Sequence, residues 1–314
     1  MKILRSLEAT PALSGKTALA IGNFDGLHLG HQKILNLLVK KARDERLISC
    51  LLTFSPHPEK IFGPEKISMI QTLDQRLESL SRFGIEIVCV VPFSREFAGL
   101  PGKDFVRKIL VKKFQARSVI VGPDFRFGKS RRGDIPAMRR FGRQFGFDVQ
   151  VVPPVRKKAL VVSSSMIREL LRLGHIGSAN QLLGRPYEIE GDVVRGEARG
   201  QRLGYPTANI QTPNEIIPRG VFVTHLELDG KILPSLANIG LRPTFEEKNL
   251  TIETHILGFH KNIYGASVKL RFLKKIREER TFGAAQELAA RIKKDADIAG
   301  RYLQKYGTEL ERRA

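Results

Sequence analysis

Gly22-Asn23-Phe24-Asp25-Gly26-Leu27-His28-Leu29-Gly30-His31 is the stretch that decides the fold of the N-terminal half. An apolar, β-like run at residues 17–22 leads into it, and apolar residues at helical spacing follow it from Leu29 to Ala42. The stretch therefore joins a strand to a helix. Its two histidines fall on one side of the first helical turn, where backbone N–H groups and the helix dipole attract anions. We expect a phosphate group to bind at this junction.

Strand-like and helix-like runs alternate around the junction. The strand-like runs lie at residues 17–22, 48–53, 86–91, 118–122 and 148–152. This alternation predicts βαβ units and a parallel, Rossmann-like sheet. Open α/β sheets bind ligands at the carboxyl ends of their strands, so the junction lies at the expected ligand edge.

Beyond residue 184 the pattern changes to short strands separated by Gly and Pro. These runs lie at residues 187–194, 221–228, 233–239, 252–259 and 267–272, and they predict an antiparallel β-barrel. Apolar residues spaced among charges at 283–306 predict an amphipathic helix packed on that barrel. We expect two domains, residues 1–184 and residues 185–314.

Composition excludes several classes of protein. The 314 residues are 42% hydrophobic and 27% charged, which is typical of a soluble globular protein. There is no apolar run of the roughly 20 residues that a membrane span needs, and residues 1–20 contain no signal-peptide core. We expect a cytoplasmic protein with no membrane partner. Cys50 and Cys89 lie in apolar runs without metal-ligand spacing, which predicts buried free thiols and no structural metal.

Charge is high and uneven along the chain. The formal net charge is +21; residues 1–183 have 31 Lys and Arg against 15 Asp and Glu, whereas residues 184–314 have 22 against 17. A positive field of this size suits nucleic acid, an anionic membrane or small phosphorylated ligands, and a solvated basic surface explains it equally well. Charge alone does not identify the ligand.

The HxGH sequence after GxFDG resembles the motif of the nucleotidyltransferase superfamily, which class I aminoacyl-tRNA synthetases share in similar form. This resemblance implies ATP and chemistry at its α-phosphate. Ser163-Ser164-Ser165-Met166-Ile167-Arg168 resembles the SSTxIR signature of the family, with a serine capping a helix over 166–173 and Arg168 in its first turn. A plain helix cap is the alternative. The implied catalytic residues are His28, His31 and Arg168, and the implied ATP-binding residues are Gly22, Asn23, Phe24, His28, His31, Ser163, Ser164, Ser165 and Arg168.

Two further stretches resemble the TFxPHP and VGxDFRFG segments of prokaryotic FAD synthetases: Thr53-Phe54-Ser55-Pro56-His57-Pro58 and residues 121–128. Prolines fix the backbone and aromatic rings offer flat surfaces, which an isoalloxazine ring needs. Buried loops with core aromatics are the alternative for each. A P-loop at 122–130 is excluded because five residues, not four, separate its glycines. The implied flavin-binding residues are Phe54, Pro56, Pro58, Asp124, Phe125 and Phe127.

The C-terminal half contains a second set of motifs. Residues 196–209 resemble the riboflavin kinase signature GxxxGRxLGFPTAN, which implies that Gly196, Gly200 and Gly204 approach ATP phosphates and that Thr207 and Asn209 hold Mg²⁺. Residues 252–257 resemble the strand with the catalytic glutamate, which implies Glu253 as general base. Residues 276–279 resemble a stretch near the flavin, which implies a flavin contact for Arg277, and residues 238–244 resemble the NIGxRPT segment of the family.

The resemblance to bifunctional riboflavin kinase/FMN adenylyltransferases thus runs from about residue 22 to residue 295. It implies phosphorylation of riboflavin to FMN, then adenylylation of FMN to FAD. The implied ligands are riboflavin, FMN, FAD and ATP with Mg²⁺; we expect no tightly bound redox cofactor and no nucleic acid. The alternatives are a monofunctional nucleotidyltransferase and a basic nucleic-acid-binding protein related to class I tRNA synthetases.

Overall fold

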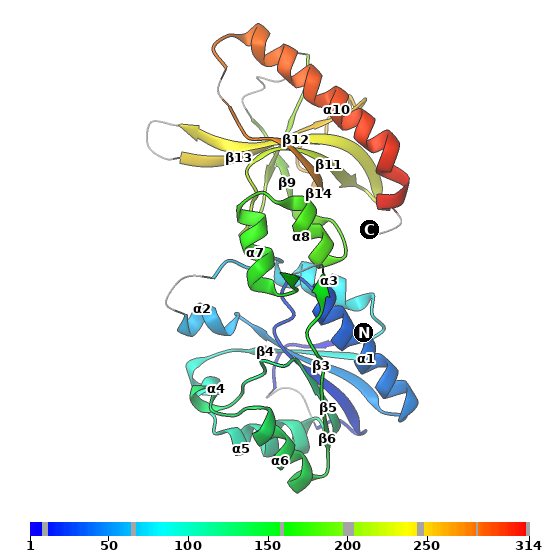
Figure 1. Ribbon diagram of the computed structural model, residues 1–314, viewed down its shortest axis with the longest axis vertical. Coiled ribbons are helices and arrows are strands. Elements are labelled where there is room, and N and C mark those ends of the chain that lie inside the picture. The colour runs from blue at the N-terminus through cyan, green and yellow to red at the C-terminus, as the bar shows by residue number, and fades with distance from the viewer. Residues whose placement is uncertain are drawn as a thin grey trace. The chain divides into compact units, whose positions relative to one another are not determined.

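The chain forms two compact units, each with its own sheet. The computed structural model describes residues 1–7, 12–63, 67–157, 160–196, 204–243, 248–280 and 282–311. The first unit comprises residues 1–68 and 73–163, and the second comprises residues 69–72 and 164–314. A six-stranded parallel sheet lies in the first unit and a closed six-stranded antiparallel barrel in the second (Figure 1). The expected order of an α/β sheet followed by a β-barrel with a C-terminal helix is confirmed.

The sheet of the first unit has the strand order β1-β4-β3-β2-β5-β6, with every neighbouring pair parallel. Its strands are β1 (Lys2–Leu4), β2 (Thr17–Ile21), β3 (Ile48–Ser55), β4 (Ile87–Pro92), β5 (Ala116–Val121) and β6 (Asp148–Val151). The sequence pattern predicts all of these except β1, because three residues give no periodicity. A short hairpin, β7 (Arg156–Lys157) with β8 (Leu160–Val161), follows the sheet.

Two helical layers cover the sheet, and alternate side chains of β2 pack against one layer or the other. Leu19 and Ile21 pack in a core cluster with the helices on one face, whereas Ala18 and Ala20 pack in a cluster with the helices on the other. The first of these layers contains the π-helix η1 (Phe105–Lys113) and α6 (Ile135–Phe145); the second contains α1 (Leu29–Asp44) and α3 (Leu73–Ser81). Shorter helices are α2 (Pro58–Phe62), α4 (Arg95–Ala98), α5 (Gly102–Asp104) and the 3₁₀ turn η2 (Lys129–Arg131).

Both cysteines lie in the sheet core as free thiols, as predicted. Burial raises the pKa of Cys89 to about 11, and burial also raises the pKa of Cys50 above its ordinary value. A thiol must ionise to act as a nucleophile, so neither thiol is reactive near neutral pH.

The strand order creates a switch point at β2. From β2 the chain continues to β3 and β4 on one side of the sheet, and it later adds β5 and β6 on the other. Ligands bind outside the carboxyl ends of the strands at such a point. The HxGH stretch follows β2, the TFSPHP segment ends β3, and residues 122–128 follow β5. The fold thus brings three predicted segments to one edge of the sheet.

The barrel has the strand order β10-β13-β12-β11-β14-β9. Its strands are β9 (Tyr187–Val194), β10 (Ala208–Gln211), β11 (Gly220–Leu228), β12 (Lys231–Pro243), β13 (Lys248–Ile256) and β14 (Ser267–Arg277). The sequence pattern does not predict β10, because a four-residue strand between glycine-rich and polar segments has too few alternating positions to be recognised.

Helices cover the outside of the barrel. The C-terminal helix α10 (Ala285–Glu311) packs through Ala299 against Val221, Val223, Leu236 and Leu273 of the barrel (Figure 1). The helices α7 (Ser164–Arg172) and α8 (Ile176–Leu183) belong to the same unit, and α8 contacts β9 and β14. Asn180 of α8 donates a hydrogen bond to the Phe272 carbonyl and accepts one from the Tyr187 N–H, both at 2.8 Å.

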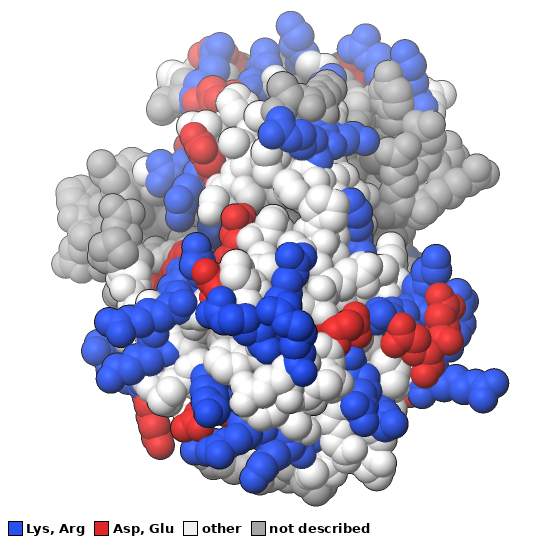
Figure 2. Space-filling model, turned by 60° about the horizontal axis from the view of Figure 1, so that its bottom comes forward, with Lys and Arg blue, Asp and Glu red and all other residues white. Residues whose placement is uncertain are grey.

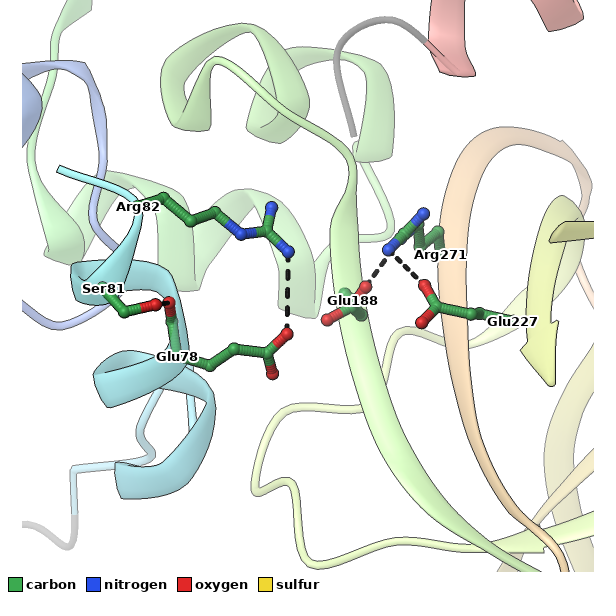
Figure 3. Close-up of polar contacts among 6 residues, drawn as sticks. All are labelled: Glu78, Ser81, Arg82, Glu188, Glu227 and Arg271. Carbon is green, nitrogen blue, oxygen red and sulfur yellow. Dashed lines mark hydrogen bonds and ion pairs between the residues drawn. The ribbon is translucent and has the colours of Figure 1, made fainter. Parts of the chain in front are cut away.

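A buried ion cluster joins three strands of the barrel. Arg271 of β14 donates to Glu188 of β9 at 2.7 Å and to Glu227 of β11 at 2.5 Å, and Figure 3 shows the guanidinium between the two carboxylates. A buried cation is tolerated only when it is paired with anions. The two carboxylates pair the Arg271 guanidinium, and the ion cluster links the three strands through their side chains.

Candidate functional site

A tight turn links β2 to α1. Phe24, Gly26 and Leu27 have positive φ angles of 53°, 82° and 39°. The side chains of Phe24 and Leu27 are 1% exposed and pack in the core beneath α1. Phe24, predicted to bind ATP, is therefore an anchor of the turn, and its ring centroid lies 5.1 Å from that of His31.

His28 caps α1 through its own ring. Its Nδ1 accepts a hydrogen bond from the His31 N–H at 3.2 Å, and the two imidazoles stack with centroids 3.6 Å apart. Because Nδ1 is an acceptor, a neutral His28 carries its proton on Nε2. A Cβ at Gly30 would come within 3.1 Å of the His28 ring, so the glycine of the motif leaves room for that ring.

Asn23 connects the turn after β2 to the TFSPHP segment. Its side-chain amide contacts Nε2 of His57 at 2.8 Å. Nδ1 of His57 accepts the Glu59 N–H at 3.1 Å and so caps α2. The Asn23 carbonyl accepts a hydrogen bond from the Thr53 hydroxyl at 3.0 Å. The predicted ATP and flavin segments are thus in direct contact at this residue.

A chain of aromatic rings joins the two predicted flavin segments. Ring centroids follow one another from Phe54 to Phe97 (5.9 Å), Phe105 (6.3 Å), Phe127 (5.8 Å) and Phe125 (5.8 Å). Separations in this range are typical of interacting aromatic pairs. The two segments are therefore parts of one aromatic wall at the switch-point edge of the sheet.

The predicted flavin residues differ in exposure. Phe127 is only 5% exposed and serves the core, whereas Pro56 and Asp124 are exposed. Phe62, which lies outside the predicted motifs, is 53% exposed, and its ring lies 6.2 Å from that of Phe93. The available signal was the unusual number of phenylalanines between residues 54 and 105.

The SSSMIR segment begins its helix earlier than predicted. Helix α7 starts at Ser164, so Arg168 is its fifth residue, beyond the first turn where the sequence analysis placed it. Serine is tolerated in a first turn, where its hydroxyl can bond to the backbone, so the helix includes Ser164 and Ser165. Arg168 is buried and belongs to the second unit.

In the barrel, three polar side chains form a row across adjacent strands. Asn209 of β10 is paired with Glu253 of β13, and Glu253 is paired with Asn238 of β12. Residues directly opposite each other in a sheet point to the same face. The predicted metal ligand Asn209 and the predicted base Glu253 are thus neighbours, and sequence reasoning did not identify Asn238 as a member of this row.

Glycines make room around Asn209. A Cβ at Gly196 would overlap the Asn209 amide, so the absence of a side chain at this glycine leaves the amide its space. Gly204 has a φ of +80° in the loop before β10. Gly200 and the rest of 197–203 lie outside the described residues, as does Thr244 of the NIGLRPT segment.

His255 supports the loop that contains Thr207. Its Nδ1 lies 2.8 Å from the Pro206 carbonyl, and its ring meets that of Tyr205 edge-on with centroids 5.5 Å apart. A carbonyl only accepts, so Nδ1 donates here. Thr207 follows directly and is partly exposed.

Arg277, predicted to contact the flavin, is engaged by α10. Its guanidinium forms an ion pair with Asp295 at 2.8 Å, and that carboxylate is 1% exposed. The neighbouring Glu279 instead reaches the NIGLRP segment, where it accepts the Leu241 N–H at 3.3 Å. A Cβ at Gly240 would occupy the space of the Glu279 carboxylate. Glu279 therefore contacts a predicted kinase segment directly.

Comparison with known proteins matches both halves. A family model described as FAD synthetase matches residues 10–166, and one described as riboflavin kinase matches residues 183–303. Bifunctional riboflavin kinase/FMN adenylyltransferases are 34% identical in Escherichia coli (94% of this chain, 96% of the relative) and 36% identical in Bacillus subtilis (91% and 92%). A solved structure described as a macrolide-efflux protein from Streptococcus pneumoniae is 28% identical with a TM-score of 0.87, covering 95% of this chain and 97% of that one. Among the described residues, no helix is long and apolar enough to cross a membrane.

Proposed function

Because this chain belongs to the bifunctional riboflavin kinase/FMN adenylyltransferase family and converts riboflavin to FMN and FMN to FAD, we propose where each reaction takes place. Residues 1–184 adenylylate FMN, and residues 185–314 phosphorylate riboflavin. The observation that carries this assignment is the row of Asn209 and Glu253 in the barrel, separate in the fold from the stacked His28 and His31. The location of both reactions is the cytoplasm, where ATP is available.

Glu253 is the general base of the kinase reaction. It accepts the proton of the ribityl 5′-hydroxyl as that oxygen attacks the γ-phosphorus of ATP; the new P–O bond forms, the bond to the β-phosphate oxygen breaks, and ADP leaves. Asn209 and Asn238, on either side of Glu253, offer amide groups that orient the phosphates and the hydroxyl. His255 fixes the segment that contains Thr207.

Kinases and adenylyltransferases use ATP with a divalent metal, and we assign Mg²⁺ to this chain. Thr207 and Asn209 provide neutral, hard oxygen donors, the kind that Mg²⁺ accepts beside phosphate oxygens and water. The space that Gly196 leaves for the Asn209 amide fits this function, because a side chain there would displace the donor. The metal, when bound, neutralises charge on the ATP phosphates.

Adenylylation needs charge stabilisation more than a base, because the FMN phosphate is already ionised. One of its oxygens attacks the α-phosphorus of ATP, the bond from that phosphorus to the bridging oxygen breaks, and pyrophosphate leaves. His28 donates from Nε2 to the α-phosphate, since its Nδ1 is occupied by the His31 N–H. We assign Arg168 to the departing pyrophosphate from its motif alone, with Ser163, Ser164 and Ser165 as ATP contacts. The flavin packs on the aromatic wall near Phe54, Pro56, Pro58, Asp124 and Phe125.

Glu253→Gln tests this assignment. The amide keeps the size and hydrogen-bonding reach of the carboxylate but cannot accept the hydroxyl proton. We expect FMN formation from riboflavin to fall by about 10²–10⁴-fold, with FAD formation from supplied FMN unchanged. Chromatography of both reactions measures this in one preparation.

The matched control is Glu227→Gln, which changes another barrel glutamate, one that belongs to the ion cluster at Arg271. We expect that control to lower thermal stability while the kinase rate of the folded protein stays near wild type. A Glu253→Gln enzyme that makes FMN within a fewfold of the wild-type rate would remove Glu253 as the base. Absence of any flavin product from the wild-type chain, together with salt-sensitive RNA binding, would favour the alternative of a nucleic-acid-binding protein.

A further inference from the structure

A buried arginine lies at the carboxyl ends of β2 and β3. Arg76 of α3 is 4% exposed. Its Nη1 donates to the Asn23 carbonyl at 2.7 Å, and its Nη2 donates to the Phe54 carbonyl at 3.1 Å. Asn23 belongs to the proposed ATP segment and Phe54 to the proposed flavin segment. One guanidinium therefore bridges the backbone of the turn after β2 and that of the end of β3, just beyond the last paired residues, Ile21 and Leu52.

The fork of Arg76 is suited to this bridge. A guanidinium presents its donors in a fixed plane, so it sets the distance and direction between two acceptors, whereas an ammonium acts as a point charge. The Asn23 carbonyl also accepts the Thr53 hydroxyl, and the Asn23 side chain contacts His57. Arg76, Thr53 and His57 together leave Asn23 little freedom to move relative to the TFSPHP segment.

Stability alone does not require a charged side chain at this place. Burial lowers the pKa of Arg76 below its ordinary value, an effect that the Asp25 carboxylate opposes. Nε of Arg76 has no hydrogen-bond partner within the described part of the chain. An apolar side chain of similar length would avoid the cost of desolvating a cation and leaving one donor unsatisfied. The cation carries this desolvation cost, and what its fork supplies is a fixed relation between the turn after β2 and the end of β3.

We propose that Arg76 is a positioning residue for adenylylation, which holds the ATP segment at Asn23 and the flavin segment at Phe54 at the spacing that in-line attack on the α-phosphate needs. Arg76 acts through these two carbonyls and does not itself contact substrate. The proposal rests on the proposed function, which assigns the two segments to ATP and to FMN.

Arg76→Met removes both hydrogen bonds and keeps most of the side-chain volume. A misplacement on the order of 1 Å costs up to about 10²-fold in rate, so we expect kcat for FAD formation from FMN to fall by about 10–100-fold. Each loop keeps its own contacts, so FMN and ATP, measured singly by fluorescence quenching and calorimetry, should bind almost as they do to wild type. FMN formation from riboflavin is the internal reference and should not change.

Arg76→Lys restores the cation without the fork, and its kcat should lie between those of Arg76→Met and wild type. The matched control is Arg43→Met, which changes an arginine of the same unit whose side chain is 79% exposed and should leave every rate unchanged. Should Arg76→Met not fold, Arg76→Lys carries the test through its kcat and its ligand binding.

Two outcomes would overturn the proposal. In one, folded Arg76→Met or Arg76→Lys makes FAD at the wild-type rate. In the other, binding of both ligands and the melting temperature decline together with kcat, and lysine restores none of them, which identifies a purely structural residue. His28→Ala separates these results from a failure of the proposed function, because normal FAD formation in that variant would remove the N-terminal site itself.

Discussion

At the scale of single residues, we assign His28 two tasks, one for each ring nitrogen. Nδ1 caps α1 by accepting the His31 N–H, and the proposed function assigns Nε2 to the α-phosphate. A helix cap contributes to folding, whereas a donor aimed at the phosphate contributes only to the transition state. One substitution can therefore separate the two tasks.

We expect His28→Asn to do so. Asparagine is among the best N-cap residues, so α1 should keep its first turn and the melting temperature should stay close to wild type. Its short side chain does not reach the position of Nε2, so FAD formation from FMN should fall by about 10²–10³-fold. Thermal unfolding by circular dichroism and a single-turnover assay measure the two effects.

His28→Gln is the companion variant, because its amide nitrogen lies nearer the position of Nε2 but glutamine caps poorly. We expect it to lose stability and to retain more activity than His28→Asn. Equal FAD formation by His28→Asn and wild type would assign the ring to capping alone.

At the scale of elements, α8 belongs energetically to the barrel. Ile176, Ala179, Leu182 and Leu183 are buried, and Asn180 bonds to the backbones of β9 and β14. Burial of a few aliphatic side chains contributes on the order of 5 kcal/mol. The predicted domain boundary at residue 184 instead assigns the residues of α8 to the first domain. The structure and the sequence therefore predict different stable fragments of the C-terminal half.

We expect a fragment of residues 164–314 to be more stable than one of residues 185–314. Both contain the whole barrel and α10, and both lack residues 69–72, so they differ only by α7 and α8. The longer fragment should melt at a temperature higher by about 5 °C or more, and it should phosphorylate riboflavin. Calorimetry of the two fragments measures the difference. Identical melting temperatures would show that α7 and α8 do not unfold together with the barrel.

At the scale of the whole molecule, positive charge is distributed unequally between the two halves of the chain. Basic side chains gather on the face of the protein in Figure 2, and every exposed position of η1 is Lys or Arg: Arg107, Lys108 and Lys112. On α6, the exposed positions include Arg139, Arg140 and Arg143. Under the proposed assignment, the flavin substrate of the first unit is the anion FMN, whereas riboflavin, the substrate of the second, is neutral. A positive field raises the encounter rate of an anion and has little effect on a neutral molecule.

We therefore expect salt to affect the two reactions differently. With ATP saturating, kcat/KM for FMN should fall severalfold between about 20 mM and about 300 mM NaCl, because the Debye length shortens to less than about 10 Å. The value for riboflavin should change much less. Sucrose at equal osmolality is the control for effects of the solution on the protein. Parallel decreases for both flavins would show that the charge does not steer FMN.

Several features could be predicted from local sequence, and others could not. The period of apolar residues predicts α1 with its buried Ile34, Leu35, Leu38 and Ala42. Helix α7 begins two residues earlier than the sequence predicts, because serine fits both a cap and a first turn. Strand β10 was missed, because its stability comes from pairing with β9 and β13 rather than from its four residues. The sequence predicts a flavin contact for Phe127, and the structure places its side chain in the core formed by residues remote in sequence.

The sequence by itself determined the family, the two reactions and the order of the two folds, because the motifs that identify the family are contiguous in the chain and periodicity is a local property. Only the tertiary structure decided which side chains meet. The register of three strands places Glu253 between Asn209 and Asn238, and the packing of α3 brings Arg76 to the carbonyls of Asn23 and Phe54. Such contacts depend on the pairing and packing of distant segments, which no short stretch of sequence specifies.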